Sequence, residues 1–303
     1  MLNRKMFQKG QRHKLLIHLF FIVACLTFVL PMIMVVSISL SSEDAVTAAN
    51  AGYSLFPRGF TLDAYKMAFG NSGSIQRAYG VTAAQAILGT LLSCIVAGMV
   101  AYPLSRSNFA YRKPITFYIF FTMLFSGGMI PTYIIYTRWY GLGDSFWVYI
   151  LPNITGGAWN TLVIRTFFKN LPESLFESAK IDGAKELRIF FQIALPLSTP
   201  VFATVGFMTL VAKWNDWNTS LIYIYNPELY TLQYLLQKVL NEAQFLRSMT
   251  ANNMVGIDFS KFKQPTETLR YALCVIAAGP MLLVFPFFQK YFSQGLTVGA
   301  VKG

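Results

Sequence analysis

Charged residues are absent from six long stretches of the chain. Each stretch is 19 to 28 residues long and is dominated by apolar side chains. The six stretches are Leu15–Ser42, Ala78–Ser105, Pro114–Thr137, Ser145–Ile164, Ile189–Ala212 and Tyr271–Gln289. A helix needs roughly 20 apolar residues to cross the hydrocarbon core, and it satisfies its own backbone hydrogen bonds there. The pattern therefore predicts an all-α integral membrane protein of six transmembrane helices.

Composition supports this prediction. Charged residues make up 13% of the 303 residues and hydrophobic residues 54%, whereas about 25% charge is usual in soluble proteins. We expect one transmembrane domain over residues 1–303. Its spans are expected at about 15–42, 78–105, 114–137, 145–164, 197–221 and 271–289. The residues around Cys25 resemble a lipoprotein cleavage site, but the apolar run continues to Leu40, so an uncleaved first helix is expected.

The distribution of Lys and Arg predicts the orientation. With the N-terminus in the cytoplasm, fifteen of these residues lie inside and ten outside. Six of the outer ten belong to the long segment 213–270, which counts for little in this rule. Both termini are therefore expected in the cytoplasm. The net charge of +12 then reflects topology and attraction to anionic lipid headgroups, and the spaced basic residues do not indicate nucleic-acid binding.

Two segments are expected outside the membrane. Residues 43–77 are polar and indicate an extracellular loop. Part of the segment 222–268 has an apolar face at helical spacing, formed by Leu232, Leu235, Leu236, Val239, Leu240, Ala243 and Leu246. This pattern predicts a helix, which either packs on the rim of the bundle or offers a surface to an extracellular partner.

A charged segment, Arg165–Arg188, lies between the fourth and fifth spans and carries nine charges of both signs. Asn170 is placed to cap a helix that has Pro172 in its first turn and Glu173 reaching back. Gly183 then interrupts the helical pattern. The segment is predicted to form a helix, a glycine elbow and a second helix. This arrangement suits the groove of a soluble partner, although composition alone is also compatible with a plain connecting loop.

The segment resembles the EAA loop of ABC importer permeases. That motif has Glu, two small residues, three others, Gly, nine others, Ile, one other and Leu-Pro. These positions are Glu177, Ser178, Ala179, Gly183, Ile193, Leu195 and Pro196, with every spacing kept. Ser178 stands where Ala is usual. The stretches 182–184, 213–216 and 295–303 look like the carbohydrate-uptake, maltose-permease-like family, and 126–131 looks like its complex-oligosaccharide subgroup.

The resemblance implies a type I ABC importer permease (MetI-like) fold in the bacterial plasma (inner) membrane. The chain would form a translocation path with a second, related permease, and an extracellular binding protein would deliver the carbohydrate. Two cytoplasmic ATPases would bind the loop 165–196 through Glu177, Ser178, Ala179, Asp182, Gly183, Leu195 and Pro196. No Gly-x-x-x-x-Gly-Lys-Ser/Thr phosphate loop occurs in the sequence. The chain is therefore expected to be no enzyme and to bind no cofactor, with ATP used by its partners.

Polar residues within the spans are costly unless they face a partner or water. They are Gln85, Ser126, Thr132, Tyr133, Asn153, Asn160, Asn215 and Asp216. Each either forms an interhelical hydrogen bond or lines a sugar path, where Trp214 and Trp217 would supply stacking surfaces. The candidate path residues are Asn153, Asn160, Trp214, Asn215 and Asp216. Lys213 and Asp216 alternatively form an ion pair at the outer membrane surface.

The charge-free spans favour a neutral or weakly charged oligosaccharide as the solute. A permease for a peptide or a phosphate ester would share the EAA loop and remains an alternative. A polytopic membrane enzyme fits less well, because the spans hold neither paired carboxylates nor a Ser/His/Asp set. The cysteines and histidines also lack metal-ligand spacing.

Overall fold

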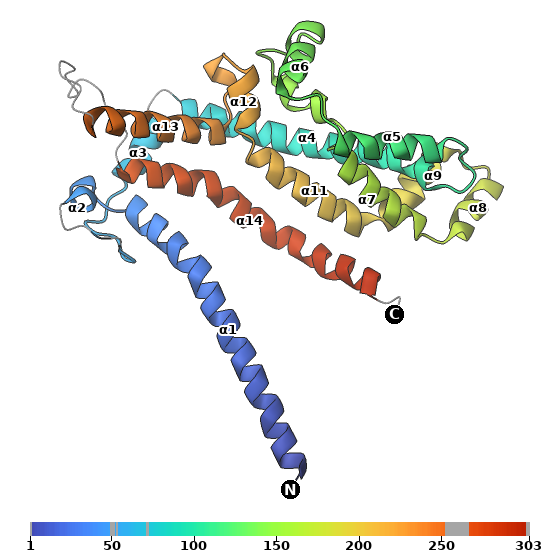
Figure 1. Cartoon of the computed structure of the whole chain (residues 1–303), viewed down its shortest axis with the longest axis horizontal. Helices are drawn as coiled ribbons and strands as arrows, with labels where there is room; N and C mark the ends of the chain where they lie inside the picture. The colour runs from blue at the N-terminus through green and yellow to red at the C-terminus, as the bar shows by residue number, and fades with distance from the viewer. Residues whose placement is uncertain (1, 49–51, 53, 71–72, 252–266, 301–303) are drawn as a thin grey trace. The chain divides into compact units, whose positions relative to one another are not determined.

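The computed structural model describes residues 2–48, 52, 54–70, 73–251 and 267–300. Every regular element among these residues is a helix (Figure 1). The chain divides into two compact units, which are Met1–Ser72 with Lys238–Ala278 and Gly73–Gln237 with Gly279–Gly303. The single domain over 1–303 stays a prediction.

Three helices in the described residues are long and apolar enough to cross a membrane. They are Lys14–Ser39 within α1 (Leu2–Ser39), α4 (Ser74–Ser105) and Glu267–Gln289 within α14 (Glu267–Ala300). Two bent helix pairs raise the number to five if each pair counts as one span. The helical membrane fold expected from the charge-free stretches is thus observed, with three to five candidate spans.

The third charge-free stretch is broken in its middle. Helix α5 (Arg112–Leu124) is followed by α6 (Met129–Ile134) and the π-helical turn η1 (Ile135–Trp139), with a bend of 112° between the two parts. Gly128 has φ 86° at the break, a conformation that only glycine adopts readily. A continuous helix over 114–137 is therefore the wrong prediction.

The fourth charge-free stretch is irregular in its first half. It consists of two short 3₁₀ turns, η2 (Phe146–Tyr149) and η3 (Leu151–Asn153), followed by α7 (Ala158–Lys169). Gly156 and Gly157 separate η3 from α7 with φ values of 65° and 89°. The prediction of one helix over 145–164 is wrong because these two glycines turn the backbone out of the helical region.

The fifth span also has interruptions. Helix α11 (Thr199–Trp214) begins after a bend of 82° from the segment Glu186–Leu197. It ends at Trp214, and α12 (Asn218–Tyr223) follows as a separate helix. The predicted span 197–221 therefore contains one long helix and one short one.

Helix α4 is the centre of the second unit, and α7 and α11 pack along it (Figure 1). Small residues on α4 let these helices approach closely. A Cβ on Gly98 would lie 2.7 Å from Cζ of Phe202 on α11. Ala97 and Ala101 of α4 are fully buried in the same core as Val205 of α11.

In the first unit, α1 is followed by α2 (Glu43–Thr47) and α3 (Asp63–Gly70). The Glu43 carboxylate accepts hydrogen bonds from the backbone N–H groups of Glu267 and Thr268 at 2.8 and 3.0 Å. It also accepts one from the Thr268 hydroxyl at 2.7 Å. An anionic side chain thus satisfies the first N–H groups of α14, where the helix dipole favours negative charge.

The helix predicted from the apolar face after residue 231 is confirmed as α13 (Leu232–Ala251). The 3₁₀ turn η5 (Pro227–Leu229) precedes it. Residues 252–266 of the predicted outer segment lie outside the described residues, as do the last three residues of the 295–303 motif.

Candidate functional site

The loop 165–196 folds as a helix, a glycine elbow and a second helix, as predicted. Helix α8 (Glu173–Ile181) ends at the elbow, and α9 (Glu186–Ile189) continues through the π-helical turn η4 (Phe190–Ala194) into α10 (Leu195–Leu197).

The elbow has the hydrogen bonds of a Schellman motif. The N–H of Ala184 donates to the carbonyl of Ala179 at 2.9 Å, and the N–H of Gly183 donates to the carbonyl of Lys180 at 3.0 Å. Gly183 has φ 77°, the left-handed conformation that this motif places just after a helix. The predicted positive φ at Gly183 is confirmed, and the sharp turn follows from it.

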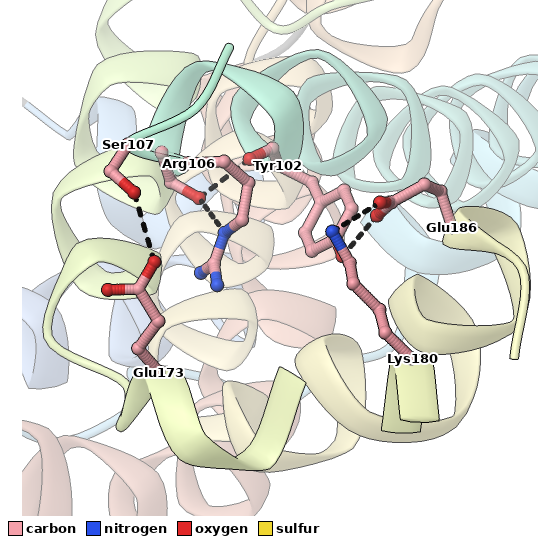
Figure 2. Close-up of polar contacts among 7 residues, drawn as sticks. Tyr102, Arg106, Ser107, Glu173, Lys180 and Glu186 are labelled. Carbon is pink, nitrogen blue, oxygen red and sulfur yellow. Dashed lines mark hydrogen bonds and ion pairs between the residues drawn. The ribbon is translucent and has the colours of Figure 1, made fainter. Parts of the chain in front are cut away.

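The start of α8 differs from the prediction. Asn170 ends α7, because its N–H donates to the carbonyl of Phe167 at 3.0 Å. Pro172 occupies the position before α8. The Glu173 carboxylate accepts a hydrogen bond from the Ser107 hydroxyl at 3.0 Å (Figure 2). The predicted cap on Asn170 is therefore wrong, because this residue already closes the preceding helix.

One face of α8 is buried in the core of the second unit. Phe176 and Ala179 are 2% and 8% exposed, and Phe176 packs with Tyr102, Phe168 and Phe190 in one aromatic cluster. Burying one phenylalanine side chain is worth about 1.5–3 kcal/mol. The loop is therefore fastened to the helices α4 and α7, which a plain connecting loop does not require.

Arg106, which directly follows α4, extends this attachment. Its guanidinium lies 3.7 Å from the centre of the Phe176 ring and 5.4 Å from that of Tyr102. It also donates to the carbonyl of Phe168 at 3.2 Å and to the Ser105 hydroxyl at 3.2 Å (Figure 2). Burial lowers the pKa of Arg106, while Tyr102 and Glu173 raise it. The guanidinium stays charged, because arginine is not deprotonated in proteins.

A second polar contact joins the two helices across the elbow. Lys180 of α8 and Glu186 of α9 form a salt bridge of 2.8 Å, and the Tyr102 hydroxyl donates to the same carboxylate at 2.8 Å (Figure 2). The hydrogen bond from Lys180 is the main reason why the pKa of Glu186 lies below its usual value. Since both partners are partly exposed, the salt bridge chiefly fixes the angle of the elbow.

The opposite face of the loop is open. Glu177, Ser178, Asp182 and Gly183 are exposed, and Ile181 is 86% exposed. No atom lies within 4 Å of the Cβ position of Gly183. Of the other predicted coupling residues, Ala179 is buried, Leu195 is half-buried and Pro196 is exposed. An exposed isoleucine between acidic residues is a feature that a soluble partner can cover.

A second candidate site is an open pocket of about 610 Å³ among α7, α11 and the irregular segment before α7. It is lined by Tyr136, Val148, Tyr149, Pro152, Asn153, Gly156, Trp159, Asn160, Met208, Thr209, Ala212, Lys213, Asp216, Thr219 and Tyr223. The lining combines aromatic rings with amides, a carboxylate and an ammonium group. Such convergent polar groups on an apolar wall are typical of ligand sites.

The pocket brings together three of the five predicted path residues, namely Asn153, Asn160 and Asp216. Asn160 is buried and donates to the Thr209 hydroxyl at 3.0 Å, so it also holds α7 against α11. The other two lie elsewhere. Trp214 is buried with its ring edge against Tyr79, and the amide of Asn215 donates to the carbonyl of Val211 at the end of α11.

Lys213 lies deeper than predicted. Its side chain packs against Gly89 in the middle of α4, and its ammonium group donates to the carbonyl of Tyr149 at 3.0 Å. Asp216 lies beyond the end of α11, where it accepts a hydrogen bond from the N–H of Thr219 at 3.0 Å. The helical spacing needed for an ion pair with Lys213 is therefore lost, and the two form no salt bridge within the described residues.

The remaining polar candidates make local or interhelical contacts. The Gln85 amide donates to the carbonyl of Lys213 at 2.8 Å and so ties α4 to α11. Ser126 accepts from the N–H of Gly128, and Thr132 donates to the carbonyl of the same glycine. The Tyr133 hydroxyl pairs with that of Tyr225 at 3.1 Å.

The sequence did not reveal the anchors of the loop, Tyr102 and Arg106. Both were expected at the end of a span, where aromatic and basic residues are common. Their partners Phe176 and Glu186 lie 74 and 84 residues away along the chain. Only tertiary packing brings them together.

Comparison with known families agrees with the fold and the loop. Residues 77–298 match the family described as the binding-protein-dependent transport system inner membrane component. Since this match covers most of the chain, the protein belongs to that family of ABC transporter permeases. It is a transport component of the membrane and no enzyme, as the sequence resemblance indicated.

Several characterised proteins are similar along most of their length. The polygalacturonan/rhamnogalacturonan transport system permease protein YtcP of Bacillus subtilis (strain 168) is 37% identical over 299 residues, covering 97% of this chain and 100% of the relative. Protein LplC of the same organism is 38% identical over 275 residues, covering 91% and 90%. A solved bacterial ABC transporter involved in the import of the acidic polysaccharide alginate contains a chain with TM-score 0.79 and 26% identity, covering 93% of this chain and 97% of that one.

Proposed function

We propose that this chain is one of two permease subunits of an ABC importer for an oligosaccharide. The observation that carries the proposal is the form of the loop 165–196. Its buried face is fixed to the membrane helices through Phe176 and Arg106, and its open face presents Glu177, Ile181 and Asp182. A rigid lever with an exposed apolar tip is suited to transmit movement from a soluble ATPase. Family membership and the sugar permeases among its relatives support this role.

The topology follows from the helices and the basic residues. We assign six crossings, of which five are α1, α4, α5 with α6 and η1, α11 and α14. The sixth is the irregular segment 146–169, which includes α7. Non-helical backbone at membrane depth is tolerated where it lines a cavity or is buried in protein, and η2 and η3 border the pocket. Lys and Arg in the short loops place both termini in the cytoplasm.

The assembly contains four further subunits. A second, related permease completes the translocation path, two cytoplasmic ATPases bind the loops, and an extracellular binding protein delivers the sugar. The open pocket among α7 and α11 supports a pathway shared with a sister subunit. ATP is hydrolysed by the ATPases, because this sequence has no phosphate loop.

The pocket is the part of the path that this chain contributes. Asn153 and Asn160 supply amide groups for sugar hydroxyls, and Tyr136, Trp159 and Tyr223 supply aromatic faces and edges. Aromatic side chains of this kind combine an apolar surface with a polar tip. The lining suits a carbohydrate better than it suits a peptide backbone or an inorganic ion.

Reconstitution of the complete complex tests the proposal. The chain, its sister permease, the ATPases and the binding protein are placed in proteoliposomes, and uptake of labelled oligosaccharides is compared with uptake of peptides. We expect ATP-dependent uptake of an oligosaccharide that is lost when any one component is omitted. Uptake of peptides alone would contradict the sugar assignment, and sugar uptake by this chain without partners would contradict the assembly.

A further inference from the structure

Lys213 lies near the middle of the membrane. A Cβ on Gly89 would lie 2.6 Å from Cε of Lys213, so the two residues are at the same depth. Gly89 is 15 residues from the first residue of α4, Ser74, and 16 from its last, Ser105. At about 1.5 Å per residue, either end of this span is about 22–24 Å away. An ionisable residue at such a depth is by default functional.

The ammonium group of Lys213 has hydrogen-bonding capacity to spare. Among the described residues it donates one hydrogen bond, to the carbonyl of Tyr149 at 3.0 Å, whereas an ammonium group has three donors. Gln85 holds the backbone of Lys213 by donating to its carbonyl. The position is thus fixed from α4, while the charged end borders the pocket.

The one acidic residue lining this pocket is Asp216. Its Oδ1 atom accepts the N–H of Thr219 at 3.0 Å, and it forms no salt bridge with Lys213 among the described residues. Local backbone therefore satisfies part of the carboxylate of Asp216, and the ammonium group of Lys213 keeps donors for another anion. The amide of Asn160 and the ring of Trp159 in the same lining suit the remainder of a sugar ring.

From this geometry we infer that Lys213 receives a carboxylate group of the transported molecule, so that the solute is an acidic, uronate-bearing oligosaccharide. This inference rests on the proposed function and specifies its substrate class. The charge-free stretches favoured a neutral or weakly charged sugar because the fifth stretch ends at Ala212, one residue before Lys213. A cation at mid-depth changes that expectation, since an ion pair with the solute would offset the cost of burying the charge.

The test uses the complete reconstituted complex and paired probes. The probes are oligogalacturonates and oligomannuronates of three to five sugars, each with its carboxyl-reduced neutral counterpart of the same length and linkage. Wild-type complex is expected to take up at least one acidic probe at least tenfold faster than its neutral counterpart. Lys213→Met keeps the aliphatic stem without the charge, and it should remove this preference by lowering acidic uptake at least tenfold. Lys213→Arg should keep at least a third of the preference.

Gly89→Ala gives an independent variant, because its methyl group displaces the end of Lys213 without removing the charge. It should lower acidic uptake severalfold and leave neutral uptake unchanged. Equal loss of acidic and neutral uptake in Lys213→Met would assign the residue a structural role and overturn the inference. Uptake of neutral oligosaccharides alone by the wild-type complex would overturn it as well, while leaving the proposed function intact. Uptake of neither kind would contradict the proposed function itself.

Discussion

The guanidinium group of Arg106 lies 3.7 Å from the centre of the Phe176 ring. Arg106 directly follows the long helix α4, and Phe176 lies on the buried face of α8. A cation over an aromatic ring is worth about 0.5–1 kcal/mol when exposed and about 2 or more when desolvated. This contact ties the loop 165–196 to a membrane-spanning helix, so a force applied to α8 reaches α4 directly.

Arg106→Met is expected to loosen α8 without unfolding the membrane helices. The substitution keeps an apolar stem against Phe176 and removes the charge together with the hydrogen bond to Phe168. We expect a loss of about 1–3 kcal/mol in the stability of the loop. Hydrogen exchange of α8 in the detergent-solubilised complex should rise, while that of α11 should stay unchanged.

A double-mutant cycle separates this contact from general damage. Phe176→Leu keeps an apolar side chain but removes the aromatic ring. If Arg106 acts through the ring, Arg106→Met should cost less in the Phe176→Leu background than in the wild type. Additive effects of the two substitutions on exchange of α8 would show that the ring contact carries no energy.

The glycine elbow predicts a strong dependence on backbone conformation. Gly183 has φ 77° and open space around its Cβ position, so a side chain there is opposed by the backbone and not by a neighbour within this chain. Gly183→Val should cost about 1–2 kcal/mol or more and should release the ATPases. Gly183→Asn is the matched control, because asparagine tolerates the left-handed region. Equal ATPase retention by the two variants would contradict this account of the elbow.

The sequence predicted the loop well because its pattern is local. The spacing of Glu177, Gly183 and Pro196 indicated two helices around a turn, and the short-range Schellman hydrogen bonds realise it. The long apolar helices were predictable for the same reason, since length and absence of charge are properties of contiguous residues. The coupling role of these residues remains a prediction.

The interruptions and the pocket were harder to predict. Gly127-Gly128 and Gly156-Gly157 mark both breaks in the sequence, but apolar residues on either side favoured continuous helices. Lys213 follows its charge-free stretch directly, so its depth depends on where α11 meets Gly89. That crossing point is set by tertiary packing, which no local pattern contains.

The proposed topology predicts the accessibility of single cysteines. In a background in which Cys25, Cys94 and Cys274 are replaced by alanine, a cysteine at Gly52 or Asn226 should react with an impermeant reagent from outside intact cells. A cysteine at Ser107 should react only after lysis, because it lies in the same cytoplasmic layer as the loop that Glu173 begins. The reverse labelling pattern would show that the chain is inserted the other way round.

The cap on α14 predicts a stability effect outside the loop. Glu43→Ala removes the acceptor of two backbone N–H groups and one hydroxyl. The expected loss is about 1–3 kcal/mol, read as a lower Tm of the purified complex. Asp44→Ala removes an exposed acidic residue at the next position and should leave the Tm unchanged. A Tm equal to that of the wild type in Glu43→Ala would show that the carboxylate does not stabilise the helix.

The central claim is that the open face of α8 binds the ATPases. Glu177→Lys reverses a charge on this face, and Ile181→Asp places a charge at its exposed apolar tip. Neither residue contributes to the buried core, so both variants should insert and pair with the sister permease normally. Glu242→Lys makes the same charge reversal on an exposed position of α13 and serves as the control.

The decisive measurement is the amount of ATPase that co-purifies with the permease pair, taken together with sugar uptake at equal permease levels. The account predicts at least a tenfold loss of both in Glu177→Lys and in Ile181→Asp, with wild-type ATPase retention in Glu242→Lys. Wild-type retention and uptake in both loop variants would contradict it and would reduce the loop to a connector between two spans.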